Sequence, residues 1–412
     1  MTPEILTEIA RKVSGKKEEK RGAYSQIWFI LLGAALSAFL LITAALFIYY
    51  GVELRGLKIK AKTFERVMTS VQRTGKTEFH PLLGNLSLPF DLQTVPLANK
   101  TGLVLNSQQI EVRGVTAPYN PSMIEYGAGH LLFFRFDLLN RESRYGFYTY
   151  IGCCELDANF QQTEKEFTTI DTGSKSSEDP RAVRIGEEIY LVFNDIQEDG
   201  YPGSRSMHIG KLNLQESKLE FSTDLDLKIK SVEKNWVPFE RIENGKPEIY
   251  FQYYLNPQKI MKLPNPKENS LVDLHYPNSS IIPKIFWPIP WGEPRGGAVA
   301  RIVDDQYLGF FHSSFKDNHE MFWYVIGAYT FEKDPPFRVT GISHYPLLFE
   351  GIYDTPHLNT AETRKRVLFP GSVSEGIKEG KEVLYLCCGE NDSGLKLITL
   401  DKKVLFNSLK KL

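Results

Sequence analysis

Five polar, turn-like motifs recur along this 412-residue chain, and they hold the residues best suited to chemistry. Their leading residues are Asn120, Asp179, Lys234, Arg295 and Leu368, so the steps between them are 59, 55, 61 and 73 residues. A carboxylate such as Asp179 can transfer a proton. Lys and Arg can hold phosphate oxygens, Lys as a point charge and Arg through a planar fork. The recurrence predicts a repeated unit that gathers these groups at one site.

Each motif leads into a short run that is rich in β-branched and aromatic residues, which is typical of strands. The runs read HLLFFRF, EEIYLVFND, PEIYFQYYL, QYLGFFHSS and EVLYLCCGE, and no convincing helical period appears after residue 110. Five units, each with room for a four-stranded sheet, predict an all-β fold, a five-bladed β-propeller. Its blades would start at a central channel, which would bring together Asn120, Asp179, Lys234, Arg295 and His312. A pair of β-sandwich sheets with unrelated turns is the alternative.

An apolar segment precedes this region. Residues 27–52 contain no charged residue, and a bilayer core needs roughly 20 apolar residues in a helix. The run is longer than the apolar part of a cleaved signal peptide, so it predicts one N-terminal transmembrane helix that acts as a signal-anchor. The predicted parts are a cytoplasmic tail (1–26), the transmembrane helix (27–52), a stalk and lead-in (53–110) and the propeller domain (111–412).

The predicted topology is a single-pass membrane protein whose large C-terminal domain lies on the non-cytoplasmic side. Six basic residues precede the span and five follow it closely, so the positive-inside rule is nearly balanced. The orientation is preferred because no other segment of the chain can span. The lipid bilayer is the predicted partner of residues 27–52. The formal net charge of -1 argues against nucleic acid as a partner.

At the five motifs the chain resembles the mannoside phosphorylases and hydrolases of glycoside hydrolase family 130, which are five-bladed propellers. It is also similar to the propeller-type β-mannosyltransferases of glycosyltransferase family 108. The resemblance spans about residues 115–405 and is carried by 177–181, 185–190, 311–312, 324–329, 334–337, 369–373 and 389–392. Two departures stand at the channel mouth. Lys234-Asn235 replaces the usual Lys-Asp, and Arg295-Gly296-Gly297 replaces a small-residue and Pro run.

The resemblance implies that Asp179 is the catalytic residue, which in the phosphorylases acts through a sugar hydroxyl. The structural alternative is an Asp179 that pairs with Arg181 and caps a turn. An inverting hydrolase would also need a second carboxylate as base, roughly 6.5–9.5 Å from the acid. Glu240 and Glu293 are the candidates by position.

Binding residues divide into two groups. A phosphate would be bound by Arg241, Arg295 and His312, although ordinary salt bridges between blades are the alternative for the two arginines. Trp287 and Trp291 would either form a rim for an acceptor glycan or pack a loop onto the body. The expected substrate-binding residues are Asn120, Ser122, Arg181, Lys234, Asn235, Trp236, Tyr324 and Asp392.

Together these features predict a membrane-anchored carbohydrate-active enzyme, with glycosyl (mannosyl-type) transfer as the first expectation. Its partner would be a glycan or a sugar-phosphate or nucleotide-sugar substrate. The alternatives are a β-mannoside phosphorylase or hydrolase, and a non-catalytic propeller that binds glycan or protein. No cofactor and no metal are expected, because no Gly-rich phosphate loop or HExxH motif is present. Cys153-Cys154 and Cys387-Cys388 are expected to be buried thiols, or to bridge the first and fifth blades.

Overall fold

The structure is a computed structural model that describes residues 88–140, 146–196, 204–225, 227, 232–276, 280–358 and 364–412, together with Glu8. The chain divides into two compact units, residues 1–79 and 80–412, and the fold below is that of the second. The predicted transmembrane helix at 27–52 lies outside the described residues. Within the described residues, none of the helices is both long and apolar enough to cross a membrane.

Three sheets of four antiparallel strands follow one another along the chain. The first holds β2 (Tyr119–Tyr126), β3 (Gly129–Leu139), β4 (Phe147–Leu156) and β5 (Thr168–Ile170). The second holds β6 (Glu178–Ile185), β7 (Glu188–Ile196), β8 (Arg205–Asn213) and β9 (Lys218–Asp224). The third holds β10 (Val237–Glu243), β11 (Lys246–Leu255), β12 (Gln258–Leu263) and β13 (Val272–Leu274).

The remaining strands form one ten-stranded sheet with two parts. One part holds β14 (Arg295–Gly296), β15 (Arg301–Val303), β16 (Gln306–Lys316), β17 (Phe322–Glu332), β18 (Val339–Ser343) and the C-terminal β22 (Leu409–Lys411). The other holds β19 (Lys365–Lys378), β20 (Lys381–Glu390), β21 (Gly394–Asp401) and the early strand β1 (Val104–Gln109). A short parallel pairing between β17 and β19 joins the parts.

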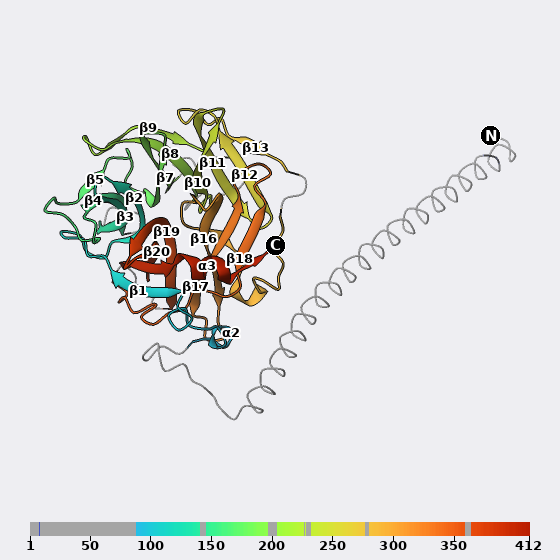
Figure 1. The fold of residues 1–412 in the computed structure, drawn as a ribbon. Coiled ribbons are helices and arrows are strands. Elements are labelled where there is room, and N and C mark those ends of the chain that lie inside the picture. The colour runs from blue at the N-terminus through green and yellow to red at the C-terminus, as the bar shows by residue number, and fades with distance from the viewer. Residues whose placement is uncertain are drawn as a thin grey trace, which may run out of the picture. The chain divides into compact units, whose positions relative to one another are not determined.

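These five strand groups form a closed ring. Strand β2 contacts β6, β6 contacts β10, β11 contacts β14, β16 contacts β19, and β19 returns to contact β2. Figure 1 shows the sheets arranged around the ring. The prediction of an all-β fold is confirmed, and the arrangement is propeller-like. The lead-in contributes more than expected, because its strand β1 pairs with β21 and completes the last group.

Helices are few among the described residues. They are α2 (Phe90–Gln93), the 3-10 turn η2 (Ile289–Trp291) and α3 (Lys402–Ser408). Helix α3 lies in the region after residue 110, where the sequence shows no convincing helical period. The carboxylate of Asp401 caps this helix by accepting a hydrogen bond from the Val404 N–H at 2.9 Å. Seven residues are too few for a clear helical period, so the cap was the available signal.

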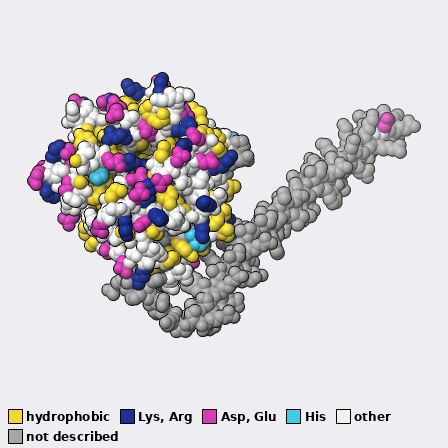
Figure 2. Space-filling model, in the orientation of Figure 1, with side chains coloured by type: hydrophobic (Ala, Val, Ile, Leu, Met, Phe, Trp, Pro, Cys, Tyr) yellow, Lys and Arg dark blue, Asp and Glu magenta, His cyan; other side chains and the backbone are white. Residues whose placement is uncertain are grey.

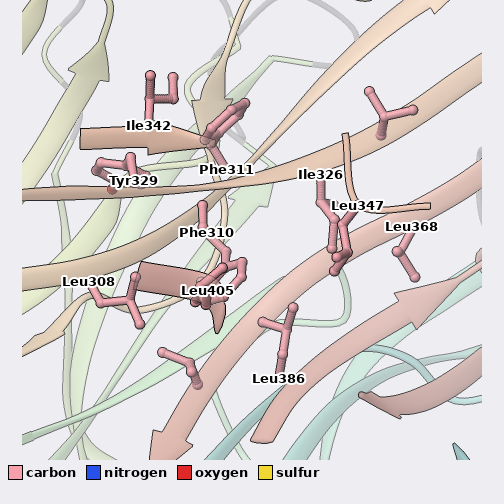
Figure 3. Close-up of a cluster of buried hydrophobic side chains, with 14 of the residues drawn as sticks. Leu308, Phe310, Phe311, Ile326, Tyr329, Ile342, Leu347, Leu368, Leu386 and Leu405 are labelled. Atoms are coloured by element: carbon pink, nitrogen blue, oxygen red, sulfur yellow. The ribbon is translucent and has the colours of Figure 1, made fainter. Parts of the chain in front are cut away.

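Apolar side chains fill the space between neighbouring sheets. Figure 3 shows part of the largest cluster, in which Phe310, Phe311, Tyr329 and Leu386 are almost fully buried. Because the sheets are covered on both faces, inner strands such as β20 are buried along most of their length. This is why the apolar runs in the sequence are continuous rather than alternating.

The four cysteines are free thiols, and all of them are buried. Cys154 and Cys387 belong to the same apolar cluster, to which the first and last groups both contribute. Burial raises the pKa of Cys154 to about 12, so its thiol stays protonated at neutral pH. The structure therefore shows buried thiols rather than a bridge between the first and fifth groups.

Serine hydroxyls tie the first strands of neighbouring groups together. The Met123 N–H on β2 donates to Oγ of Ser372 on β19 at 2.7 Å. The Ala182 N–H on β6 donates to Oγ of Ser122 on β2 at 2.9 Å. Ser122 is fully buried, and its expected place among the substrate-binding residues stays a prediction. Its hydroxyl satisfies a backbone N–H that would otherwise be buried without a partner.

Strands β19 and β2 approach each other closely at Gly371. A Cβ atom on Gly371 would lie 1.5 Å from the carbonyl oxygen of Pro121 on β2, a distance that real atoms do not reach. Only glycine therefore allows β19 to pass β2 at this point.

We expect Ser372→Ala to lower the free energy of unfolding by about 1–3 kcal/mol, because it leaves the Met123 N–H buried without a partner. Ser374→Ala is the matched control on the same strand, since the Ser374 hydroxyl is buried and has no hydrogen-bond partner among the described residues. Chemical denaturation measures both values. Equal losses for the two variants would contradict the proposed tie.

Candidate functional site

Two of the sequence motifs adopt the same backbone form where their sheets begin. Asn120 and Asp179 both have positive φ angles, 47° and 56°, and each is followed by a proline. Both strands are irregular here, because the pairing register shifts within β2 and within β6. Asn and Asp tolerate the left-handed region better than other non-glycine residues. The bulges re-aim the two side chains, and Asn120 Nδ2 donates to Asp179 Oδ1 at 2.7 Å.

Asp179 is partly buried among cations. Nη1 of Arg135 lies 3.6 Å from its carboxylate, and Nδ2 of Asn194 lies 3.5 Å away. Burial alone would raise the pKa of Asp179. The charges of Lys234, Arg135 and Arg181, with the Asn120 hydrogen bond, outweigh burial and hold that pKa well below its usual range. The carboxylate is therefore ionised at neutral pH.

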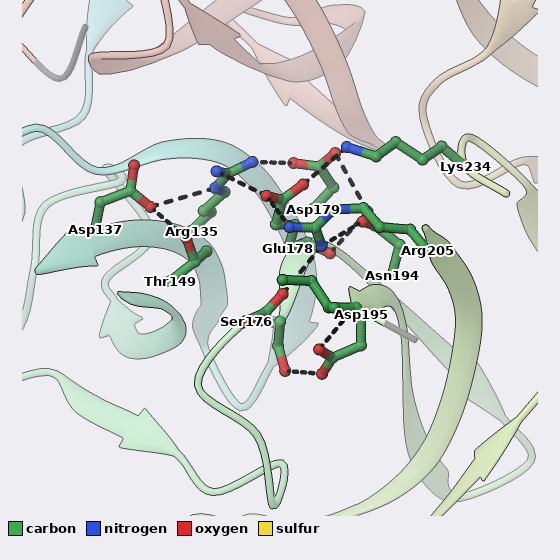
Figure 4. A network of polar contacts seen from close by, with 12 residues as sticks. Arg135, Asp137, Thr149, Ser176, Glu178, Asp179, Asn194, Asp195, Arg205 and Lys234 are labelled. Carbon is green, nitrogen blue, oxygen red and sulfur yellow. Dashed lines mark hydrogen bonds and ion pairs between the residues drawn. The ribbon is translucent and has the colours of Figure 1, made fainter. Parts of the chain in front are cut away.

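The adjacent carboxylate, Glu178, organises these cations (Figure 4). Its Oε1 receives Nη2 of Arg135 at 3.0 Å and Nη2 of Arg205 at 2.6 Å. Its Oε2 receives Nζ of Lys234 at 2.8 Å. Glu178 is buried, so each pairing is largely shielded from water. We call Arg135, Glu178, Asp179, Asn194, Arg205 and Lys234 the polar cluster.

Arg181 joins the polar cluster to other parts of the ring. Its Nε donates to the carbonyl oxygen of Gly297 at 2.7 Å, and its guanidinium lies over the ring of Phe369 at 4.9 Å. The side chain is almost fully buried. Burial lowers the pKa of Arg181 to about 10, although the charge of Asp179 opposes the shift. Its positive charge is therefore only partly compensated.

His312 and Arg295 face each other in register on β16 and β14. The ring of His312 is buried, stacks on Tyr324 at 6.0 Å and lies 4.8 Å from Phe369. Its Nδ1 has no hydrogen-bond partner among the described residues. Burial, together with the charges of Arg295 and Arg181, lowers the pKa of His312 to about 3. The imidazole is thus neutral at physiological pH.

Arg295 differs from the other cations because its side chain is exposed. Its charge acts on His312 and on Tyr324. Within the described ranges it forms no ion pair. Arg295 thus lies beside a buried histidine, and no carboxylate among the described residues forms an ion pair with it.

Asp392 follows β20 in the left-handed region, with a φ of 51°. Burial raises its pKa, Arg135 and Lys365 oppose the shift, and Asp179 and Asp137 reinforce it. Burial also raises the pKa of Tyr324, with a further contribution from Asp392. The charge of Asp179 acts on Asp392, and the charge of Asp392 acts on Tyr324, so both residues belong to the electrostatic surroundings of Asp179.

Asn235, the residue that departs from the family pattern, has a φ of 66° and lies just before β10. Its carbonyl oxygen faces Gly296, where a Cβ atom would lie 2.1 Å away. A Cβ on Gly297 would similarly lie 2.6 Å from the Phe310 carbonyl oxygen. Close packing between sheets therefore explains the two glycines after Arg295.

Several expected site residues lie elsewhere. Trp236 is fully buried, donates from Nε1 to Glu233 at 3.2 Å, and packs edge-on against Phe251 and Tyr253. Its ring belongs to the apolar core, and its expected contact with a substrate stays a prediction. In the folded chain, Trp236 makes contacts with other aromatic side chains.

Arg241 is also away from the polar cluster. It pairs with Glu243 on its own strand and with Asp334, at 3.1 Å, from the turn after β17. The salt bridge between strand groups that was the alternative for this residue is therefore observed, while its expected phosphate-binding role stays a prediction.

The remaining candidates by position are accounted for as follows. Glu240 accepts a hydrogen bond from the Gly186 N–H at 2.7 Å, a contact between the second and third sheets. Glu293 is exposed. Trp287 and Trp291 are buried and pack edge-on at 5.2 Å, so they hold a loop onto the body rather than form a rim.

Sequence reasoning missed Arg135, Asn194 and Arg205 as members of the polar cluster. Arg135 interrupts the apolar run HLLFFRF on β3, and a charge within such a run was the available signal. Glu178 lay inside a quoted motif but received no role. No group of three or more His, Cys, Asp or Glu side chains could hold a metal ion in the part of the chain that the structure describes.

Comparison with solved structures identifies the fold. The β-1,2-mannobiose phosphorylase of Listeria innocua matches at a TM-score of 0.50 and 16% identity, over 75% of this chain and 97% of the phosphorylase. A member of the GH130 family, described as mannoside phosphorylases that include glycoside hydrolases acting on β-1,2-mannosidic linkages in Candida mannan, matches at 0.50 and 12%, over 70% and 85%. A provisionally described glycoside hydrolase from Parabacteroides distasonis matches at 0.50 and 12%, over 70% and 88%.

These identities establish a shared fold and leave the activity open. The resemblance to glycoside hydrolase family 130 noted in the motifs is confirmed at the level of the fold. None of the three structures is described as a family 108 transferase. Neither a family model nor a curated protein sequence matches the chain.

The depressed pKa of His312 predicts a pH-dependent stability. The unfolded histidine titrates near 6.5 and the folded one near 3, so the unfolded state binds more protons between these values. Stability must then fall as the pH falls through this window. Between pH 7 and pH 5 we expect wild type to lose about 2 kcal/mol more than His312→Gln, which has no titrating group there. Denaturant titrations at both pH values measure this difference. Parallel losses in the two proteins would show that His312 is not buried in the neutral form.

Proposed function

We propose that this chain is a carbohydrate-active enzyme that cleaves β-mannosidic bonds by phosphorolysis, with the five strand groups as the blades around its site. The observation that carries the proposal is the pair of cations, Arg181 and Arg295, whose charges act on His312 together with that of Asp179. Arg181 is buried with a partly compensated charge, and Arg295 has no carboxylate partner among the described residues. Such a site stabilises a bound anion. The shared fold with a β-1,2-mannobiose phosphorylase supports phosphate and a β-mannoside as the substrates.

The proposed reaction forms one bond and breaks one. A phosphate oxygen attacks the anomeric carbon of the mannosyl group, and the glycosidic C–O bond breaks. The leaving oxygen takes a proton that is held by Asp179 and delivered directly or through a sugar hydroxyl. The products are mannose 1-phosphate and the released sugar.

The protonation of Asp179 needs an explanation, because the carboxylate is ionised in the free protein. A phosphate beside Lys234 and Arg181 would offset two of the three charges that lower the pKa of Asp179. Dihydrogen phosphate can also supply the proton that Asp179 then passes to the leaving oxygen. Binding of the anion would therefore prepare the acid.

Hydrolysis is less well supported, because it needs an ionised base to activate water. Glu240 is engaged between two sheets, and Glu293 is exposed. Asp392 lies in the electrostatic surroundings of Asp179, where burial raises its pKa.

Mannosyl transfer was the first expectation from the sequence. It was based on the expected membrane anchor, and no particular residue of the site supports it over phosphorolysis. A nucleotide-sugar or sugar-phosphate donor could use the same cations, so donor assays must separate the two reactions. The membrane anchor at 27–52 remains part of the proposal.

We expect Asp179→Asn to lower kcat for phosphorolysis of β-1,2-mannobiose by about 10²–10⁴-fold, because the amide cannot carry the proton. Release of mannose 1-phosphate measures the rate. Glu293→Gln is the control, since this carboxylate is exposed, and it should keep wild-type turnover. Unchanged turnover in Asp179→Asn would refute the assignment. Binding of mannosides without turnover of any donor, including nucleotide-activated mannose, would identify a non-catalytic glycan-binding protein.

We expect Arg295→Gln to raise the KM for phosphate about tenfold or more, because a charge-assisted contact of about 1.5–3 kcal/mol is lost. The free energy of unfolding should change little, since the side chain is exposed. Arg241→Gln is the matched control. It should lower the free energy of unfolding, because it breaks the contacts to Glu243 and Asp334, and it should leave the KM for phosphate unchanged. Bond cleavage at the same rate with and without phosphate would make the enzyme a hydrolase.

A further inference from the structure

The segment between β13 and β14, which contributes no residue to the polar cluster, exposes apolar side chains. In the segment between β13 and β14, Ile281, Ile285 and Ile289 are 71%, 75% and 67% exposed. Single exposed apolar residues are common, but three large ones within nine positions form a group that contact with water does not favour. We call these three residues, together with the exposed Lys284 among them, the isoleucine face.

Buried tryptophans and hydrogen bonds anchor the segment that carries the isoleucine face; we call these anchors its support. The neighbouring Trp287 and Trp291 are buried, and their indoles donate to Oγ of Ser313 at 3.1 Å and to the carbonyl oxygen of Asp91 at 2.9 Å. The Ile282 N–H donates to Oδ1 of Asn256 at 3.1 Å. The alternation of anchored tryptophans with exposed isoleucines means that the segment is fastened on one side and presents its apolar side chains on the other.

The position of this face in the unit is informative. Asp91, which receives the Trp291 hydrogen bond, belongs to α2 at the start of the described domain. Residues at the start of the described domain therefore lie beside the support of the isoleucine face, and residues 27–52, the expected membrane span, come earlier in the sequence.

A further apolar feature adjoins the same support. Tyr345 lies 6.4 Å from Trp291, ring to ring, and lines a mainly apolar cavity of about 470 Å³ with Leu103, Leu347 and Leu405. The apolar residues near this support therefore include more than the three isoleucines.

The charge of the segment also favours one kind of partner. Residues 280–292 contain Lys284 and no Asp or Glu. Apolar side chains flanked by a basic residue suit the boundary between lipid headgroups and acyl chains.

We propose that the isoleucine face rests on the lipid bilayer, with Ile281, Ile285 and Ile289 inserted at the headgroup boundary and Lys284 among the headgroups. The domain would then hold a defined orientation on the membrane instead of moving freely on its stalk. This inference does not depend on the catalytic proposal.

The full chain in nanodiscs of phosphatidylcholine and phosphatidylserine tests the proposal. The four native thiols are buried, so a single exposed cysteine can be labelled selectively with an environment-sensitive fluorophore. The test variants are Ile285→Cys and Ile289→Cys. The matched control is Ile377→Cys, since Ile377 is 67% exposed on β19. We expect a quencher carried on the lipid chains to reduce the emission of the two test variants at least twofold and to leave the control unchanged.

Three results would overturn the proposal. Equal quenching at all three positions, or none at any, would show that the isoleucine face has no special contact with lipid. Shielding of the label in detergent that disappears on dilution would identify a second copy of the chain as the occupant. Loss of the chain from the nanodiscs would show that neither the expected span nor the isoleucine face holds it to lipid. Because none of these readouts measures turnover, failure here is distinct from failure of the proposed reaction.

Discussion

The burial of the Glu178 carboxylate is the constraint on which the centre of this protein depends. A buried carboxylate is tolerated only when cations and hydrogen bonds compensate it, and removal of one partner typically costs about 3–5 kcal/mol. Its partners are Arg135 on β3, Arg205 on β8 and Lys234 just before β10. They come from three successive sheets, so the charge is satisfied only when those sheets are in place. The same pairing holds Arg135 and Lys234 beside Asp179 and keeps that carboxylate ionised.

Backbone conformation serves the same centre. Asn120, Asp179 and Asn235 all occupy the left-handed region near the start of a sheet, at an energetic cost that tertiary packing must offset. The result is a set of short polar side chains that turn away from the regular alternation of a strand. The Gly-Gly pair after Arg295 belongs to this arrangement, because the Asn235 carbonyl occupies the space that a side chain at Gly296 would need. The departures from the family pattern at Asn235 and Arg295 are thus linked by one packing contact.

Some parts of this arrangement were predictable and others were not, for identifiable reasons. The spacing of the Asn-Pro, Asp-Pro and Phe-Pro-Gly motifs predicted the strand groups, because turns and bulges depend on local residue types. The meeting of Asn120 with Asp179 followed from that repetition. The core position of Trp236 was not predictable, because an aromatic residue beside a polar motif suits a sugar platform and a core position equally well. The partner of Arg241 was not predictable, because the neighbouring turn at Asp334 supplies it. The short helix α3 escaped notice because its seven residues are fewer than a periodicity test needs.

The sequence by itself determined the all-β character, the order and number of the strand groups, and the residue types at the motif that starts each group. These properties follow from side-chain preferences within a few residues of each position. The tertiary structure alone decided that Ser122 ties two strands, that Trp236 lies in the core and that Arg135 and Glu178 organise the cations. It also decided that Asp179 is ionised and His312 neutral, whereas burial raises the pKa of Asp392. Burial and charge at one atom are sums over groups from several sheets, and those groups become neighbours only when the ring closes.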